Sequence, residues 1–474
     1  MPASHLRRVA ALAVLLLGAA MVMLDLTIVN VALPSLRASL GAGEAIMSWT
    51  IAGFSLANAL ILIPAGRLGD RLGHAWVFLA GIALFAGASL SSGLAEDPVH
   101  LIASRVLQGL GGGMVLPMVG ALIQLMYEGR ERARPFAALG ATIGVTAATG
   151  PLLGGLIIAA FGQHDGWRCV FFINVPLGVL AIVATLLLLP KRTAAGSGGF
   201  DPVGLVLITV ALAAVLVPII EGRDWGWPWW AIAVIAAGLL LLVAFGAWQR
   251  RVAAAGRTPL VPHRLFARLA FTGGVVLAFV YFAAFTCIFF ALSILWQAGM
   301  GHSALDTGLM LVPFSAASVV GAICSPRAIA RLGRASLALG VGLLTIGLGI
   351  VWGILVLVPG DELDHWQLLA PLAMAGLGSG LFITPNIQFI VATVERSVAG
   401  AANGVISTMQ RIGAALGVAV AGTVIFALHE QLAADGASEI DAFAHGVGAS
   451  IGISALLGAI AFCLVFTLPK RVGH

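Results

Sequence analysis

Three charged side chains stand inside long apolar stretches of this 474-residue chain: Asp25, Arg105 and Arg411. A charge near the centre of a bilayer costs roughly 2.5–3.5 kcal/mol on insertion scales, so such residues usually have a function. Asp25 is the one acidic residue deep in any apolar stretch. Burial favours the neutral form of a carboxyl group and a nearby arginine favours the charged form. Asp25 is therefore the strongest candidate for a group that takes up and releases a proton.

Arg105 is the candidate partner of Asp25. At 1.5 Å per residue, Asp25 lies about 12 Å from the outer end of its predicted helix, and Arg105 about 10 Å from the outer end of a helix that runs the other way. Equal depth permits an ion pair. Two alternatives stay open: a static buried pair, or an Asp25 carboxylate that is hydrogen-bonded to Thr27 or Asn30.

The elements that must position these residues are membrane-spanning helices. Hydrophobic residues make up 60% of the chain and charged residues 9%, whereas a soluble domain carries about 25% charged residues. Apolar runs of roughly twenty residues, the length that crosses a bilayer as helix, predict an all-α polytopic membrane protein with fourteen spans. These are residues 9–33, 46–65, 75–94, 99–127, 135–160, 168–189, 203–220, 229–248, 269–295, 305–324, 336–358, 367–391, 399–428 and 446–468.

The distribution of charge predicts the orientation. With the N-terminus inside, the cytoplasmic segments hold 20 of the 25 Lys and Arg residues, and the outer segments hold 14 of the 20 acidic ones. Short cytoplasmic loops are enriched in basic residues. We therefore expect a plasma-membrane protein embedded in the lipid bilayer, with both termini in the cytoplasm. The net charge of +5 is spread over short loops, which does not favour nucleic acid as a partner.

An internal repeat divides the chain. The segment at 109–117, GLGGGMVLP, recurs at 376–385 as GLGSGLFITP, and RLGH at 71–74 recurs at 331–334 as RLGR. The offset predicts six-helix bundles at 1–189 and 269–474. The segment between them, 190–268, would be a linker that contains a transmembrane hairpin. Repeated halves with a site at the midplane are typical of secondary transporters.

The predicted loop between spans two and three reads GRLGDRLGH at 66–74. Its glycines allow a tight turn, and Asp70 lies among arginines at the cytoplasmic surface. The gating candidates here are Gly66, Asp70, Arg71 and Gly73. The alternative is an ordinary basic loop that only sets the orientation.

Further motifs cover the rest of the chain: LDLTIVNVALP at 24–34, RVLQGLGGG at 105–113, GATIGVTAATGPLLGG at 140–155 and GWRCVFFINVPLG at 166–178. With the loop motif and fourteen spans, they resemble the major facilitator superfamily, and within it the fourteen-helix drug:proton antiporter family. The resemblance implies proton-coupled export of lipophilic drugs, antibiotics or related small molecules by alternating access. It also implies that Asp70 lies beside the start of span thirteen, where a helix N-terminus stabilises an anion and would hold the inner side shut.

Span five carries small residues at helical spacing, with Gly150 and Gly154 four apart and Pro151 between them. Small residues let helices approach closely, and proline kinks a helix. We predict that this face slides against the other bundle during gating. Ordinary tight packing is the alternative.

The substrate-binding candidates lie at plausible cavity depth. Phe282, Phe285 and Phe289 form an aromatic stripe, which is either packing or an apolar wall. Arg411 either lines the cavity or extends toward the inner surface. The remaining candidates are polar or soft side chains: Asn30, Gln108, Asn386, Met409 and Gln410.

Other functions are less well supported. A proton symporter that imports a small nutrient or peptide is the main alternative, and the 140–155 segment argues against it. An enzyme or ATP-driven pump is disfavoured because Lys191 and Lys470, the chain's two lysines, do not follow a phosphate-binding glycine loop. A non-transporting scaffold or receptor is a further alternative. We expect no metal site, no cofactor and a monomer whose partners are a small-molecule substrate and protons.

Overall fold

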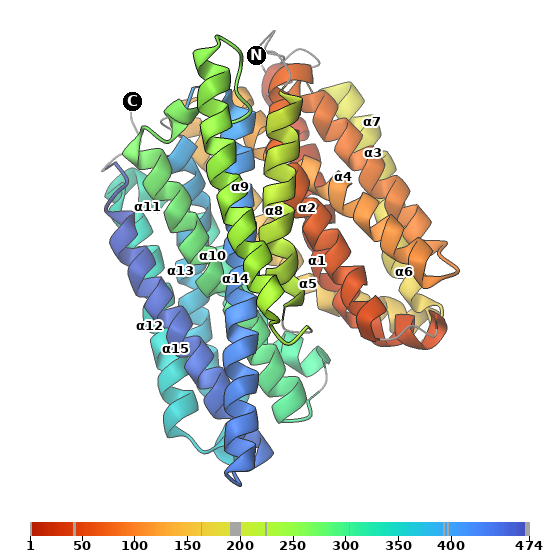
Figure 1. Ribbon diagram of the computed structural model, residues 1–474, viewed down its shortest axis with the longest axis vertical. Helices are drawn as coiled ribbons and strands as arrows, with labels where there is room; N and C mark the ends of the chain where they lie inside the picture. Colours follow the sequence, from red (N-terminus) through yellow and green to blue (C-terminus); the bar gives the residue numbers. More distant parts are fainter. Residues whose placement is uncertain are drawn as a thin grey trace.

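The computed structural model contains helices and no strands among the residues it describes, which are 2–40, 44–162, 164–189, 201–222, 225–302, 304–391, 394–395 and 398–469 (Figure 1). The helices are α1 Pro2–Leu40, α2 Glu44–Leu72, α3 His74–Gly93, α4 Pro98–Met126, α5 Ala133–Phe161, α6 Gly166–Phe172, α7 Asn174–Leu188, α8 Pro202–Glu221, α9 Trp229–Ala254, α10 Leu269–Ile294, α11 Ala304–Leu332, α12 Ala335–Leu357, α13 His365–Val391, α14 Ala399–Ala434 and α15 Glu439–Val465.

The helices account for the fourteen predicted spans. Thirteen segments of the described chain are long and apolar enough to cross a membrane, and α6 and α7 together form one of them. The fourteenth is α5, a helix of 29 residues. Six spans precede the α8–α9 hairpin and six follow it, so the predicted multi-pass helical fold is confirmed. The residue limits of the two halves, 1–189 and 269–474, stay a prediction.

The sequence repeat corresponds to a repeated packing arrangement. In the first half, a side chain at Gly109 or Gly113 of α4 would collide with the backbone of α2. In the second half, a side chain at Gly376 or Gly380 of α13 would collide in the same way with the backbone of α11. Glycine at these positions lets the helices of each pair pack backbone to backbone.

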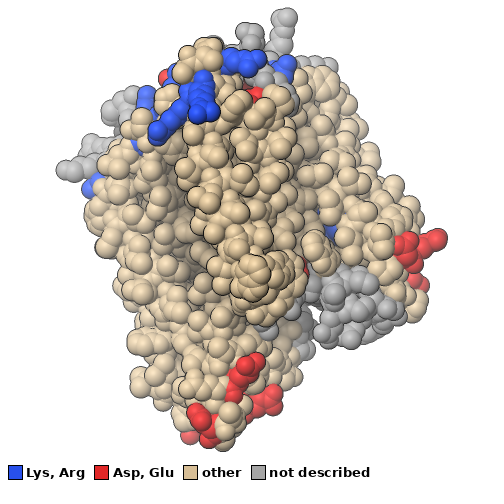
Figure 2. Space-filling model, in the orientation of Figure 1, with Lys and Arg blue, Asp and Glu red and all other residues tan. Residues whose placement is uncertain are grey.

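Charge separates the two ends of the molecule (Figure 2). Lys and Arg gather at the end that carries both termini, which we call the basic end, and Asp and Glu gather at the opposite, acidic end. The helices of the two halves lie close together toward the basic end and diverge toward the acidic end (Figure 1).

The segment 66–74 is not the loop that the sequence predicts. Helix α2 continues through Leu72, so Gly66, Asp70 and Arg71 are helical. The turn is confined to Gly73, whose φ of 99° lies in a region that glycine adopts without strain. The repeat has the same feature at Gly333, with φ of 56°. Charged side chains in the last turns of α2 interrupted the apolar run before the helix itself ended.

The α8–α9 hairpin packs beside α2 and α14, so it touches one helix from each half (Figure 1). Asp201 caps α8 by accepting the Gly204 N–H at 2.8 Å. The same carboxylate accepts hydrogen bonds from Trp248 at 3.0 Å and Gln249 at 2.8 Å, both on α9. These bonds fix the two arms of the hairpin to one another at the basic end.

Candidate functional site

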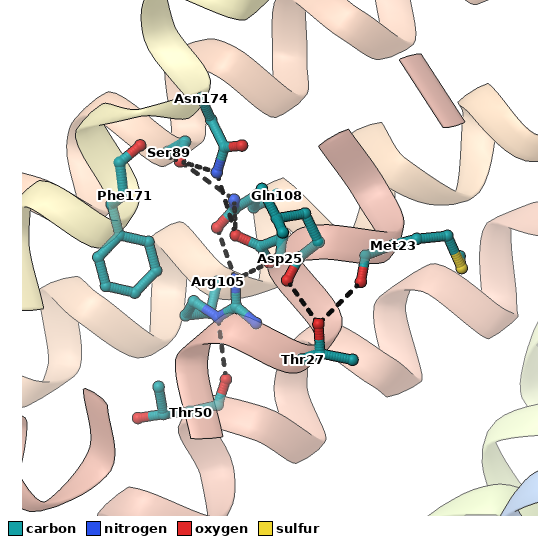
Figure 3. A network of polar contacts seen from close by, with 10 residues as sticks. Met23, Asp25, Thr27, Thr50, Ser89, Arg105, Gln108, Phe171 and Asn174 are labelled. Carbon is teal, nitrogen blue, oxygen red and sulfur yellow. Dashed lines mark hydrogen bonds and ion pairs between the residues drawn. The ribbon is translucent and has the colours of Figure 1, made fainter. Parts of the chain in front are cut away.

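Asp25 of α1 and Arg105 of α4 are in direct contact (Figure 3). Arg105 Nη1 lies 2.5 Å from Asp25 Oδ2. Asp25 is 0% exposed and Arg105 is 1% exposed. A buried ion pair of this kind is stable only when its remaining donors and acceptors are also satisfied.

Neutral side chains complete the surroundings of the Asp25 carboxylate. Gln108 Nε2 donates to Oδ1 at 2.7 Å, and Asn174 Nδ2 lies 3.3 Å from the same oxygen. Both amides also donate to Ser89 Oγ of α3, at 3.2 and 3.1 Å. Asn174 is the first residue of α7, immediately after the break between α6 and α7. The break therefore brings a fourth segment to the site.

The guanidinium of Arg105 is held on several sides. Nη1 also donates to Gln108 Oε1 at 2.7 Å, and Nε donates to the Thr50 carbonyl oxygen of α2 at 3.1 Å. Its central carbon lies 4.2 Å from the centroid of the Phe54 ring, a cation–π contact that stabilises a desolvated charge. Arg105 is therefore fixed by α1, α2 and its own helix.

The network is sealed from solvent in this conformation. The side chains of Asp25, Arg105, Gln108, Ser89 and Asn174 are all buried. A proton can reach Asp25 only after a rearrangement that opens the pair to water. The static-pair alternative therefore stays open on geometry alone.

Thr27 and Asn30 were the two other hydrogen-bond partners considered for the Asp25 carboxylate. Thr27 donates to the Leu24 carbonyl oxygen at 3.1 Å, a bond within its own helix. The side chain of Asn30 lies outside the described part of the chain.

Helix α5 lies between this site and the second half. It packs along α1 in the first half and along α11 and α13 in the second. A side chain at Gly150 would collide with Thr27, and one at Gly144 would lie 3.7 Å from Ser318 and Val319 of α11. Gly154 is buried, and the side chain of Pro151 is outside the described part.

Asp70 lies at the N-terminus of α14. Its carboxylate accepts the backbone N–H of Gly400 at 2.9 Å and that of Ala401 at 3.0 Å. His74 Nε2 lies 3.1 Å from Oδ1 and Arg67 lies 3.7 Å from Oδ2. The positive end of a helix dipole stabilises such an anion. The contact joins the two halves at the basic end.

Close backbone packing surrounds this contact. A side chain at Gly66 would collide with the carbonyl oxygen of Gly400, and one at Gly404 would crowd Leu62 of α2. Gly73 forms the turn that follows. Arg71, which the sequence grouped with Asp70, is exposed.

The predicted aromatic stripe forms a wall on α10. Phe285 and Phe289 lie 5.1 Å apart between ring centroids, and both contact Phe314 of α11, at 5.9 and 5.1 Å. Phe282 contacts Phe285 at 5.8 Å. The three stripe residues are half-buried, whereas Phe314 is buried. Each of the three stripe residues therefore keeps part of its ring surface accessible, and their role in substrate binding stays a prediction.

The other substrate-binding candidates separate into two groups. Gln410 and Arg411 are half-buried in the middle of α14. Met409 packs against the apolar cluster shared by α2, α8 and α14, and Asn386 is buried with its Oδ1 unbonded among the described residues. Gln108 belongs to the Asp25 network. Met409, Gln410 and Arg411 all keep part of their surface accessible.

The sequence missed several members of the Asp25 network. Asn174, Ser89 and Thr50 are short polar residues, which are common in membrane helices and carry no charge signal. Asn174 lies in the quoted 166–178 motif, and this was the one available indication. Their roles depend on which helices touch, and a single sequence does not contain that information.

Comparison with known proteins agrees with the geometry. The family model described as "Major Facilitator Superfamily" matches residues 15–203, 191–418 and 274–473. A probable actinorhodin transporter of Streptomyces coelicolor is 37% identical over 95% of this chain and 78% of its own length. A cephamycin export protein of Amycolatopsis lactamdurans is 33% identical over 96% of this chain and 92% of its own length.

Solved structures share the fold. The human organic anion transporter MFSD10 superposes with a TM-score of 0.66 at 16% identity, covering 97% of this chain and 99% of that chain. The proton:xylose symporter XylE superposes with a TM-score of 0.62 at 14% identity, covering 96% and 95%. The chain is thus a transporter rather than an enzyme, and it belongs to the Major Facilitator Superfamily.

Proposed function

We propose that this protein exports lipophilic antibiotics or related small molecules from the cell in exchange for protons. Three relatives support the direction and the class of cargo by their names: the actinorhodin transporter, the tetracenomycin C resistance and export protein of Streptomyces glaucescens (32% identical) and a multidrug resistance protein of Mycobacterium tuberculosis (31% identical). The importing symporter considered from the sequence has no counterpart among these three.

The observation that carries proton coupling is the Asp25–Arg105 contact inside the first half. An acid held in an apolar interior by one arginine changes its proton affinity strongly when that contact changes. Separation of Arg105 from Asp25 favours proton uptake, and renewed contact favours release. Protonation and substrate would then favour different conformations, and such differential affinity produces coupling.

The gate would work at the basic end, which we assign to the cytoplasm because basic residues concentrate on cytoplasmic loops. In the present conformation the Asp70 carboxylate holds the N-terminus of α14, and Gly66 packs against Gly400. Release of this contact would open the cavity to the cytoplasm. The plasma membrane would be the site of action, with both termini inside and a monomer as the working unit.

The free energy released by one proton per cycle is sufficient to drive export. A proton that crosses 100 mV releases about 2.3 kcal/mol. A tenfold gradient of a neutral substrate costs about 1.4 kcal/mol. One titrating carboxylate can thus sustain more than a tenfold gradient.

Transport in proteoliposomes with an imposed pH gradient tests the proposal. Wild-type protein should move dyes and antibiotics from a broad panel out against their gradients, and collapse of the pH gradient should stop uphill movement. Asp25→Asn keeps the size of the side chain but cannot load a proton. It should retain downhill exchange and lose pH-driven accumulation. Uphill, pH-driven export by Asp25→Asn would refute the assignment of Asp25.

A further inference from the structure

Arg411 borders the space between the two halves. It lies 7 residues after Gly404 and 11 after Gly400, which is about two and three helical turns, so it shares their face of α14. At Gly400 and Gly404 this face packs onto α2 of the first half. Arg411 therefore faces the first half about 10 Å closer to the acidic end than Gly404.

The space opens at the level of Arg411. Residues 401–406 of α14 are all buried. Between 407 and 420, only Thr408, Gly413 and Gly417 are buried, and the two glycines face α10. Arg411 is deep among protein atoms, yet part of its surface is accessible. Because Arg411 lies on the face of α14 that meets the first half, we infer that this accessible surface borders the space between the halves and not the lipid.

Arg411 has no hydrogen bond or ion pair with any residue that the structure describes. Arg105, the other deep arginine, is fully engaged by Asp25, Gln108 and Thr50. Charges in protein interiors are normally paired, because an isolated buried charge is costly. Asp25 is already neutralised by Arg105. Among the described residues, Arg411 is therefore a positive charge on this face of α14 without a matching anion.

The aromatic wall lies on α10, a direct neighbour of α14. Gly413 and Gly417 pack against the backbone of Phe279 and Ala283, so α10 and α14 run side by side in register. Phe282 is then about 7 Å closer to the acidic end than Arg411, and Phe289 about 18 Å closer. An acidic group at Arg411 would leave the rest of a ligand along Phe282, Phe285 and Phe289.

We propose that Arg411 is the counter-ion of the substrate, and that the exported compounds are aromatic acids whose carboxylate, phenolate or enolate binds Arg411 while their rings lie on the α10 wall. This inference rests on the proposed export function and narrows its cargo to anions. Arginine suits the role because its planar guanidinium binds a carboxylate through two parallel hydrogen bonds.

Three probes on one anthracene frame test the charge preference without any mutation. They are anthracene-9-carboxylic acid, its methyl ester and 9-(aminomethyl)anthracene, and their binding to the full chain in lipid nanodiscs is measured by fluorescence anisotropy. Wild-type protein should bind the acid at least tenfold more tightly than the ester or the amine. Equal or tighter binding of the amine or the ester, or binding of none of the three, would overturn the proposal.

Variants then assign the preference to Arg411. Arg411→Gln should weaken binding of the acid at least tenfold and change binding of the ester by less than twofold. Arg411→Lys should retain part of the preference. Arg250→Gln is the control, since Arg250 is exposed on α9, and it should match wild type. Equal weakening of all three probes by Arg411→Gln would mean a structural role and would contradict the proposal.

Failure of this inference is distinguishable from failure of export. If wild-type protein in proteoliposomes exports the ester or the amine but not the acid, export stands and Arg411 is not the counter-ion. If it exports none of the wider panel, the export function itself fails.

Discussion

Gly150 of α5 lies directly against the side chain of Thr27, two residues after Asp25 on α1. The same helix, at Gly144, approaches α11 of the second half. Helix α5 thus connects the opposite half to the helix that carries the buried acid. We propose that movement of the second half against α5 is transmitted through this contact to α1 beside Asp25, which would give the glycines of span five a role in coupling.

Gly150→Ala should reduce pH-driven export at least tenfold. Alanine is normally the better helix residue by up to about 1 kcal/mol, so any loss must come from the clash with Thr27. Overpacking of this kind costs roughly 1–3 kcal/mol. Initial efflux rates and thermal melting of the purified variant measure the two effects.

Gly155→Ala is the matched control, because a side chain at Gly155 meets no atom within 4 Å. It should transport like wild type. Thr27→Ala in the Gly150→Ala background removes the atom nearest to the clash and should restore part of the rate. Full activity of Gly150→Ala would show that this contact is not needed for transport.

Much of the fold could be predicted from the sequence. Long apolar runs, the segregation of charge and the repeat of the Gly109 and Gly376 segments indicated fourteen spans in two halves. The helix ends were less accurate because α2 continues through a charged segment to Leu72. Hydropathy records where a helix leaves the lipid, whereas helical structure continues while its backbone hydrogen bonds are satisfied.

The candidate site was predictable only where charge marked it. Asp25, Arg105 and Asp70 stand out because acids and arginines are rare in apolar surroundings. Asn174 and Ser89 complete the network through contacts between α1, α3 and α7, and these depend on packing. Met409 was assigned to the cavity by depth, and this stays a prediction; its partly buried side chain packs against the apolar cluster shared by α2, α8 and α14.

Removal of one member of the Asp25–Arg105 pair should destabilise the protein more than removal of both. Arg105→Gln leaves a buried carboxylate without its cation, and loss of one partner of a buried pair costs about 3–5 kcal/mol. Asp25→Asn leaves the buried guanidinium of Arg105 without its anion. The double variant leaves neutral side chains that can still bond to Gln108.

Thermal melting in detergent should therefore rank the double variant above both single variants. Arg250→Gln serves as the surface control and should melt like wild type. If the double variant melts lower than either single variant, the pair is not the main electrostatic contact at the site, and our description of the network is wrong.

Asp70→Ala should weaken closure at the basic end. It removes two hydrogen bonds to the N-terminus of α14, and each hydrogen bond to a charged group contributes about 1.5–3 kcal/mol. The population should then shift toward a conformation open at that end. A single cysteine at Asn403, which is buried between α4 and α14, reports the change through labelling by a membrane-impermeant maleimide.

Labelling from the basic side should be several-fold faster in Asp70→Ala than in the parent with the same single cysteine. Asp70→Glu is a useful comparison, because it keeps the charge but moves it by one methylene group. Its labelling rate should fall between those of Asp70→Ala and the parent. Unchanged labelling in Asp70→Ala would show that backbone packing at Gly66 and Gly400 closes this end by itself.

Export of an acid should respond to membrane potential more steeply than export of a neutral compound. If an anion with one negative charge leaves as one proton enters, two charges move in the favourable direction, which yields about 4.6 kcal/mol at 100 mV. The ester would gain half of this, and a monovalent cation would gain nothing. Proteoliposomes with equal pH on both sides and a potassium–valinomycin potential separate the three cases.

The steady-state gradient of anthracene-9-carboxylic acid should increase by more than a thousandfold between 0 and 100 mV, and that of the ester by roughly fiftyfold. Because Arg411 supplies the binding charge, Arg411→Gln should abolish acid transport and leave the response of the ester intact. A potential response of the acid no steeper than that of the ester would mean that the substrate crosses in its neutral, protonated form.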